Sequence, residues 1–396
     1  MKQTQTKYFS FDDVGLDFCA ASGNLIMDRF KKMLVTGYNE NTVSAVSVTD
    51  STVVFTYSAA HGYVEDRVLK VTDGPLVAIN GGEFRIDSVT TNTVTMTIEG
   101  APGSVSSGFN TKVAPLGWEL VFELNRVHVF KYKSLDETDL YARFFYSPIS
   151  GIGAIFPCVG ASYDNATGFI TDPYADQLNK DILTYPVSNN LRWMTYNYGS
   201  GTGFANYTYA QGVAQNFGRG MIVGSKYHFA LLNNLVANNG CMVNALIPAN
   251  LLNYPSLKLP VIFGASQNLN SHSNQTLRIL CGALDITLYW NNSTTVVRYA
   301  VTSANSYLPT TIDADNTTAA FPPIIREYNT QQVLGMGLGC FICGYALNNQ
   351  PTRTANSSPA MSIETDFSHR VITHGIGPDN GPLYFAFPIE EIKYVT

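Results

Sequence analysis

The sequence has little charge and no long apolar run. Only 14% of its 396 residues are charged, against about 25% in ordinary soluble domains. The 24 basic and 30 acidic residues leave a net charge of −6. Since no cluster of Lys and Arg occurs, we expect no direct binding to nucleic acid. No stretch of 18 apolar residues exists, so we expect no membrane-spanning helix.

Cysteine and histidine are also scarce. Six Cys are too few for a disulfide scaffold, and Met1–Phe11 lacks the apolar centre of a signal peptide. These features predict folding in a reducing cytoplasm. Cys340 and Cys343 have CxxC spacing, but no second pair follows, and the apolar residues between them predict a buried strand without a metal. His369 and His374 would point to opposite faces of a strand; we interpret them as surface or loop residues.

Recognisable catalytic motifs are missing. Gly199–Gly203 is rich in glycine, but it lacks the lysine of a phosphate-binding loop and does not lead into a helix. The nucleophile-elbow and zinc-protease motifs do not occur. Paired carboxylates such as Glu390 and Glu391 lie in charged turns, where solvation explains them; scattered carboxylates of the glycosidase type stay an open alternative. We expect a protein that is not an enzyme, with no catalytic, cofactor-binding or metal-ligating residue and no cofactor.

The clearest local pattern is one amphipathic helix. Ser22 is a candidate N-cap, and Gly37 follows at the position of a helix stop. Apolar residues between them recur at helical spacing, which predicts a helix over Ser22–Val35 that packs against the body of the protein. The apolar stripe comprises Leu25, Ile26, Phe30, Met33 and Leu34.

A group of short strands follows the helix. Alternating and β-branched segments, separated by turn residues, predict a small β-barrel or β-sandwich module over residues 41–113. Asn80 and Gly81 are expected to close a hairpin in it, and Gly100–Gly108 is interpreted as a linker or long loop. The predicted strands are Thr42–Val48, Thr52–Tyr57, Val68–Thr72, Glu83–Val89 and Thr93–Ile98.

The rest of the chain shows strand patterns only. Trp118–Leu124 and Val127–Tyr132 predict a hairpin across Asn125 and Arg126. From there to Leu383–Phe387, short apolar pieces such as Val296–Val301 alternate with Asn, Pro and Gly. We therefore predict a mainly β protein with three parts: an N-terminal arm and helix (1–40), the small module (41–113), and a large antiparallel β-sandwich domain with long loops (114–396).

The aromatic residues are mostly Tyr (23) and Phe (22), with three Trp. Tyrosine suits interfaces because its ring is rigid and apolar and its tip is polar. The arm residues Tyr8, Phe9 and Phe11 are our candidates for contact with another subunit, since an unanchored aromatic arm would expose apolar surface. A second set is a candidate to face a sugar or a partner protein, although ordinary strand faces explain it equally well. This set flanks the glycine-rich loop: Tyr196, Tyr198, Tyr207 and Tyr209.

Several motifs of the first third occur together in a known order. An Ala-His-Gly-Tyr turn at residues 60–63 is followed by the Asn-Gly turn at residue 80, a Val-Thr-Thr-Asn-Thr strand at 89–93 and Ala-Pro-Leu-Gly-Trp-Glu at 114–119. This order resembles a small β-module of tailed-bacteriophage virion proteins, over about Gly23 to Lys133. In the module His61 is expected to be a turn residue, because Gly62 accepts positive φ.

The resemblance implies a structural protein of the neck, collar, tail or baseplate. It implies assembly into a homo-oligomeric ring, contacts with other virion proteins, and location in the virion after assembly in the host cytoplasm. Two alternatives stay open. One is a virion surface protein that binds a receptor or a host glycan, and the other is a virion-associated hydrolase.

Overall fold

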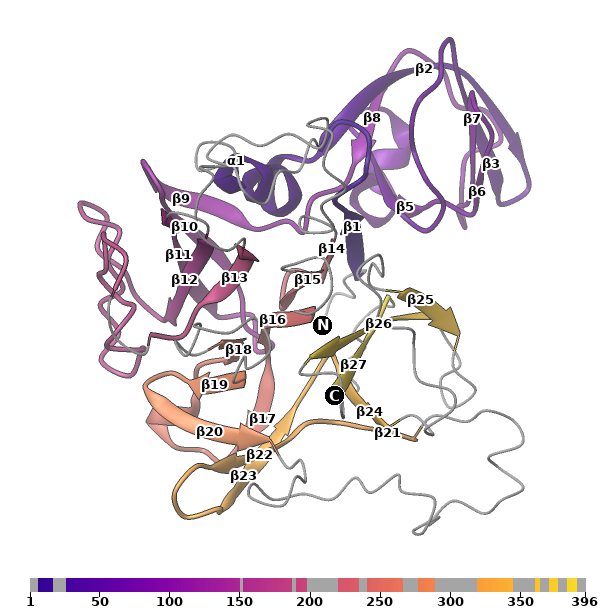
Figure 1. Cartoon of the computed structure of the whole chain (residues 1–396). Coiled ribbons are helices and arrows are strands. Elements are labelled where there is room, and N and C mark those ends of the chain that lie inside the picture. The colour runs from indigo at the N-terminus through magenta and orange to yellow at the C-terminus, as the bar shows by residue number, and fades with distance from the viewer. Residues whose placement is uncertain are drawn as a thin grey trace, which may run out of the picture.

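The computed structural model is mainly β, as predicted, and consists of antiparallel sheets that pack on one another (Figure 1). Among the residues it describes, no helix is both long enough and apolar enough to cross a membrane. The structure describes residues 6–16, 26–149, 152–186, 190–197, 220–234, 241–265, 277–288, 319–344, 360–363, 370–376 and 383–389.

The predicted helix is present from Ile26 onward. Helix α1 (Ile26–Lys31) continues into a π-helical turn, η1 (Lys32–Thr36), and ends at Gly37, whose φ of +74° favours glycine. Its apolar residues Ile26, Phe30, Met33 and Leu34 are buried, which confirms its role as a packing element. Ser22 and Leu25 lie outside the described residues.

A seven-stranded sheet follows, in the order β5-β4-β8-β2-β3-β7-β6. The long strand β2 pairs with β8 near its start and with β3 near its end, so the sheet curls around it (Figure 1, upper right). Every second residue of β3 is buried, as expected for a sheet with one solvent face. The strands are β2 (Tyr38–Thr49), β3 (Thr52–Tyr57), β4 (Val68–Val71), β5 (Glu83–Arg85), β6 (Ser88–Val89), β7 (Thr93–Thr97) and β8 (Asn110–Val113).

One prediction for this region needs correction, and for a second the structure selects between two alternatives. Asn80 and Gly81 both have positive φ, but they lie in a short helical turn, η3 (Asn80–Gly82), that follows η2 (Pro75–Ala78). The turn is therefore one part of the long connection between β4 and β5, not a tight hairpin. Of the two alternatives for Gly100–Gly108, the structure bears out the long loop, because the segment joins β7 to β8 within the same sheet and buries Val105.

A five-stranded sheet has the order β13-β12-β11-β10-β9. The predicted hairpin is confirmed: Leu124 pairs with Val127 across the turn at Asn125, whose φ is +52°. The strands are β9 (Glu119–Leu124), β10 (Val127–Lys133), β11 (Asp139–Ile149), β12 (Ile152–Gly160) and β13 (Trp193–Asn197).

Two further sheets form the rest of the described body. The ten-stranded sheet has the order β1-β14-β15-β16-β18-β19-β20-β22-β23-β17, and the C-terminal sheet has the order β21-β24-β27-β26-β25. Their strands are β1 (Lys7–Ser10), β14 (Gly220–Gly224), β15 (Phe229–Asn234), β16 (Cys241–Ile247), β17 (Ala249–Leu251), β18 (Val261–Ala265), β19 (Leu277–Cys281), β20 (Leu284–Leu288), β21 (Ala319–Phe321), β22 (Ile324–Glu327), β23 (Val333–Gly337), β24 (Phe341–Gly344), β25 (Ala360–Ile363), β26 (Arg370–Ile376) and β27 (Leu383–Pro388), with the short turn η4 (Pro255–Leu257). The predicted piece Val296–Val301 lies outside the described residues.

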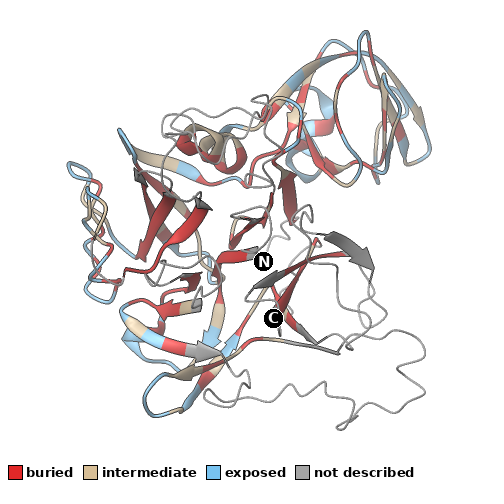
Figure 2. Ribbon diagram, in the orientation of Figure 1, coloured by how far each residue is buried: buried red, intermediate tan, exposed pale blue. Residues whose placement is uncertain are grey.

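The ten-stranded sheet is the middle layer of the molecule. Along β15, Phe229 and Leu231 enter the core that contains α1 and the five-stranded sheet. Ala230 and Leu232, which point the other way, enter the core shared with the C-terminal sheet. Buried residues therefore run through the centre of the body in Figure 2, and sheet-on-sheet packing holds the large β region together.

Candidate functional site

The N-terminal aromatic residues are part of the protein's own core. Tyr8, Phe9 and Phe11 are 4%, 0% and 2% exposed, because the whole of β1 pairs with β14 and the segment joins the ten-stranded sheet between two cores. Phe9 packs on the ring of Tyr38. The expectation that these three side chains contact another subunit is therefore wrong: the chain itself covers them.

A buried ion pair fastens the same segment to the seven-stranded sheet. The Arg67 guanidinium donates to both carboxylate oxygens of Asp13, at 2.9 and 2.6 Å, and the Tyr38 hydroxyl donates to Oδ2 at 2.6 Å. Arg67 also lies over the ring of Tyr8, 4.0 Å from its centroid. These partners satisfy the charges that burial would otherwise make costly, so the cluster joins parts of the fold and is not open to a ligand.

The second predicted set of aromatics is largely beyond the described structure. Tyr196 belongs to strand β13, where its backbone pairs with that of Gly153 in β12. Tyr198, Tyr207 and Tyr209 lie outside the described residues.

His61 has the structural role that the motif predicted. Its Nε2 lies 2.9 Å from the Thr90 carbonyl and 3.2 Å from that of Thr93. Its Nδ1 accepts the Tyr63 amide at 2.9 Å, and Gly62 has a φ of +70°. Both ring nitrogens are used to hold the turn, and the contacts fit the neutral form protonated at Nε2.

Most of the CxxC segment lies in a strand, as predicted. Cys340 is buried just before β24, and Cys343 lies in β24 opposite Tyr384. His374 was expected at the surface, but it is buried in β26, with Nε2 3.2 Å from the Asn233 carbonyl. His369 lies outside the described residues. Within the described ranges, no group of three or more His, Cys, Asp or Glu side chains is placed to hold a metal ion.

One buried pair has the spacing of a nucleophile and its base. Ser225 Oγ lies 2.8 Å from His228 Nδ1, within the range expected for an activated serine. However, the two residues are 0% and 1% exposed, and burial lowers the pKa of His228 to about 4. Ser225 Oγ accepts the Tyr227 amide, and its carbonyl accepts the Trp118 indole N–H at 2.9 Å. The pair holds a tight corner and is covered by protein.

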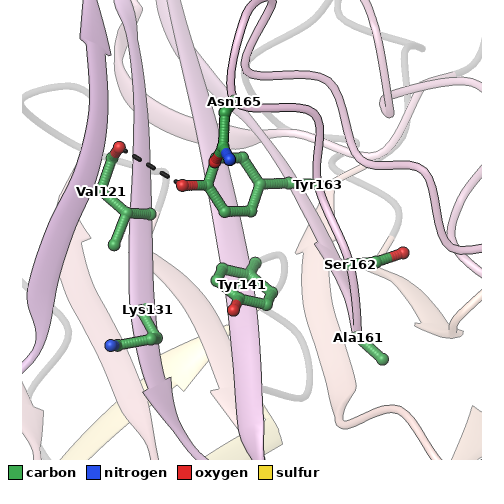
Figure 3. A pocket seen from close by; sticks show the side chains of 7 residues that line it. All are labelled: Val121, Lys131, Tyr141, Ala161, Ser162, Tyr163 and Asn165. Atoms are coloured by element: carbon green, nitrogen blue, oxygen red, sulfur yellow. Dashed lines mark hydrogen bonds between the residues drawn. The ribbon is translucent and has the colours of Figure 1, made fainter.

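A shallow groove on the five-stranded sheet is an open site formed by described residues (Figure 3). It has a volume of about 350 Å³ and lies between β9, β10, β11 and the loop that follows β12. Directly opposed residues of antiparallel strands share a face, and Glu119, Lys131 and Tyr141 are in register across the three strands. The groove is lined by Val121, Lys131, Tyr141, Ala161, Ser162, Tyr163 and Asn165.

A β-bulge shapes the strand side of the groove. Val129 pairs with Phe122 and Phe130 pairs with Leu120, so Val121 is the extra residue of β9. A bulge leaves such a residue outside the regular ladder, and the Val121 carbonyl is instead approached by the Tyr163 hydroxyl at 3.4 Å. This contact draws the loop toward the sheet (Figure 3). The Tyr163 ring lies 4.7 Å from that of Tyr141, tilted by 41°.

Arg143 of β11 holds the loop in place from below. Its guanidinium is buried and donates to the carbonyls of Gly168, Asn179 and Ile182 at 3.1, 3.2 and 2.5 Å. Burial lowers its pKa to about 10. Gly168 has a φ of +71° and lies so close to the Phe122 ring that a Cβ would collide with it. The loop therefore has a fixed path over the sheet.

The charges at the groove are balanced. Lys131 pairs with Glu119, and the neighbouring Lys133 pairs with Asp139 at 2.6 Å. The hydrogen bond from Lys131 to Glu119 raises the pKa of that lysine, and burial raises the pKa of Tyr163. The groove therefore presents two tyrosine side chains beside matched ion pairs.

The sequence patterns did not point to this groove. Tyr141 is one residue of an apolar-rich strand, and Tyr163 lies in a loop whose path depends on Arg143. The one irregularity in the sequence is an arginine among the apolar residues of a predicted strand, and it does not show which loop supplies its acceptors. No protein-family model matches the chain, and the comparison with curated proteins finds no match.

Proposed function

We propose that this protein is a structural component of a tailed-bacteriophage particle, in the neck, collar or tail, that acts by assembly and not by catalysis. The sequence of the first third, with its Ala-His-Gly and Asn-Gly turns and its Ala-Pro-Leu-Gly-Trp-Glu motif, supports the proposal. The charged fraction of 14% supports it further, because a neutral surface suits contact with other protein.

The observation that best supports a mechanical role is the packed junction between the first third of the chain and the larger β region. Trp118 of the Ala-Pro-Leu-Gly-Trp-Glu motif stacks on Tyr132, with centroids 4.5 Å apart, and donates to the Ser225 carbonyl. Phe30 of α1 packs against Phe144 and Phe229 of two different sheets. A module seated in this way would pass force to the large β region through packed side chains, not through a flexible tether.

Exposed apolar side chains offer surface for assembly at the far end of the ten-stranded sheet. Val333 and Met336 of β23 are 49% and 43% exposed, and Leu252, which follows the adjoining strand β17, is 40% exposed. Apolar side chains gathered in this way favour contact with another protein. Obligate contacts of subunits in a ring bury more than about 2,000 Å².

The test is to measure the copy number of the protein in purified particles and its mass in solution. We expect a fixed copy number by quantitative mass spectrometry, antibody labelling at the neck or tail by electron microscopy, and an oligomer by light scattering. A stable monomer that is absent from mature particles would overturn the proposal. Hydrolysis of host cell-wall material by the purified protein would overturn the non-catalytic role.

A further inference from the structure

We propose that the groove between β9, β10, β11 and the loop after β12 binds a neutral saccharide of one or two sugar units. The inference goes beyond the structural role and does not depend on it, since binding is measured on the purified chain. The groove volume of about 350 Å³ lies at the small end of the range of about 300–1,000 Å³ for small-molecule sites.

The two tyrosines supply the surface on which a sugar ring would stack. One face of a pyranose carries mainly C–H groups, which pack well on an aromatic ring. Tyr141 and Tyr163 are both half-buried, and their rings meet at 41°, so the pair forms a bent apolar wall in an otherwise polar groove (Figure 3). Tyr141 is fixed by its strand and Tyr163 by its contact with Val121. Little rotamer entropy is therefore lost on binding.

Hydrogen-bonding groups of both kinds surround this wall. The Lys131 ammonium donates, the Glu119 carboxylate beside it accepts, and the exposed side chains of Ser162 and Asn165 do both. Sugar hydroxyl groups are donors and acceptors at once. Neighbouring hydroxyls of one ring can therefore bond to a lysine and a carboxylate that lie side by side.

The charge balance distinguishes a neutral sugar from an acidic one. A uronate or a phosphate ester needs a cation without a partner of its own, or a bidentate arginine. At the groove Lys131 is paired with Glu119, and Lys133 with Asp139. An anion would have to displace a carboxylate already in place, whereas a neutral sugar leaves both ion pairs intact.

Asp164 and Asp172 give the loop its shape before any ligand arrives. Asp164 accepts the Ala166 amide at 2.8 Å and the Thr167 hydroxyl at 2.9 Å, next to Asn165. Asp172 accepts the amides of Ala161 and Tyr174, both at 2.8 Å. These turns keep the groove residues of the loop in position over the sheet.

The experiment is saturation-transfer NMR with the purified full chain. The probes are the methyl glycosides of glucose, galactose, mannose and N-acetylglucosamine, the disaccharide lactose, and glucuronate as an acidic counterpart. We expect transfer to at least one neutral probe, and a dissociation constant obtained by titration. Transfer to no neutral probe, or to glucuronate alone, would overturn the proposal.

Variants then place the binding in the groove. Tyr163→Ala should weaken binding about tenfold, because the loss of one stacked ring is worth roughly 1.4 kcal/mol. Tyr163→Phe keeps the ring and should stay within about threefold of the parent. Tyr254→Ala, at a tyrosine that is 56% exposed outside the groove, should leave binding unchanged.

Asn165→Ala is a second variant that should not disturb folding, because the Asn165 side chain is exposed while it lines the groove. It therefore tests the groove even if Tyr163→Ala alters the path of the loop. It should weaken binding about threefold while the melting temperature stays constant, in keeping with the loss of one modest hydrogen bond. If both Tyr163→Ala and Asn165→Ala bind the probe as the parent does, the sugar binds elsewhere and the assignment to this groove is wrong.

Discussion

The ten-stranded and seven-stranded sheets are built from similar β-forming residues but are covered in different ways. In the ten-stranded sheet, Phe229–Leu232 of β15 and Met242–Ile247 of β16 are buried without interruption. In the seven-stranded sheet, β3 alternates between buried and partly exposed positions, and only Tyr38 and Val43 of β2 are buried. A strand covered on both faces carries a nearly continuous run of apolar residues, whereas a strand covered on one face alternates, so the sequence of each strand follows the number of layers around it.

A sheet buried on both faces has to satisfy its polar side chains internally. Asn233 donates to the Met194 carbonyl at 3.0 Å, and Asn244 donates to Asn233 Oδ1 at 3.1 Å. The backbone carbonyl of Asn233 lies 3.2 Å from Nε2 of His374, which belongs to the C-terminal sheet. Polar residues of the seven-stranded sheet, such as Ser44 and Thr52, are instead exposed. The central layer is therefore more sensitive to a change of side-chain chemistry.

The largest effect should come from removing a ring at the junction of the layers. Phe229 packs against Phe30, Trp118, Phe144 and Trp193. Phe229→Ala should lower the free energy of unfolding by about 5 kcal/mol, the upper end of the range for such truncations. Phe55→Ala is the matched variant in the seven-stranded sheet. Phe55 is also fully buried but packs edge-to-face against Phe109 of the same module.

We expect Phe55→Ala to cost about 3 kcal/mol. Urea titration followed by tryptophan fluorescence measures both variants, because Trp118 and Trp193 lie in the core beside Phe229. Equal losses for the two variants would contradict the distinction between the central and the peripheral sheet.

The next effect concerns the ion pair that joins the N-terminal segment to the seven-stranded sheet. Arg67→Met leaves Asp13 and its charge buried, and should cost about 3 to 4 kcal/mol. The double variant Arg67→Met with Asp13→Leu removes both charges, so it should be more stable than the single variant. Urea denaturation of the parent and both variants provides the comparison. A double variant less stable than Arg67→Met would contradict this expectation and would show that Asp13 stabilises the fold through its other partners, the Tyr38 hydroxyl and the Ser10 amide.

Acid should weaken the central layer through His228. Burial lowers the pKa of His228 to about 4, below the value of about 6.5 expected when the chain is unfolded. The unfolded state therefore binds more protons between these values, and stability is complete above about pH 6.5 and falls toward pH 4. We expect a loss of about 2 kcal/mol from this residue between pH 7 and pH 5.

His228→Gln should make the dependence on pH shallower without abolishing it. Burial also lowers the pKa of His128 to about 4, and that residue is unchanged in the variant. Urea titrations at pH 7 and pH 5 measure the difference for parent and variant. If the two proteins lose the same free energy, His228 is not the group responsible.

The smallest effects test one hydroxyl in place of one methyl group. Val223 of β14 is fully buried, whereas Val54 of β3 lies on the partly exposed face of its sheet. Val223→Thr should cost about 1.5 kcal/mol, because the hydroxyl is buried in an apolar layer. Val54→Thr should stay within about 0.5 kcal/mol of the parent. Melting temperatures by calorimetry resolve the pair, and equal values would remove the contrast between the sheets.

Local sequence patterns were enough to predict helix α1, strand β3 and the turn at Asn125. The helix stripe of Ile26, Phe30 and Met33 and the alternation of β3 both report a single buried face. The turn at Asn125 is likewise fixed by neighbours in sequence. Such features depend on contacts and backbone preferences within a few residues, so they can be predicted without knowledge of the fold.

Local patterns were enough to predict that the chain is mainly β, with one helix and a strand-rich module after it, because the periodicity and the turn residues that define these elements lie close together in the sequence. The tertiary structure, by contrast, makes Tyr8, Phe9 and Phe11 core residues, since β14, the strand with which β1 pairs, lies more than 200 positions away. It also decided the groove, where a bulge at Val121, a buried Arg143 and a distant loop bring Tyr163 onto Tyr141. Long-range pairing of this kind leaves no local pattern, because each residue involved looks ordinary among its own neighbours.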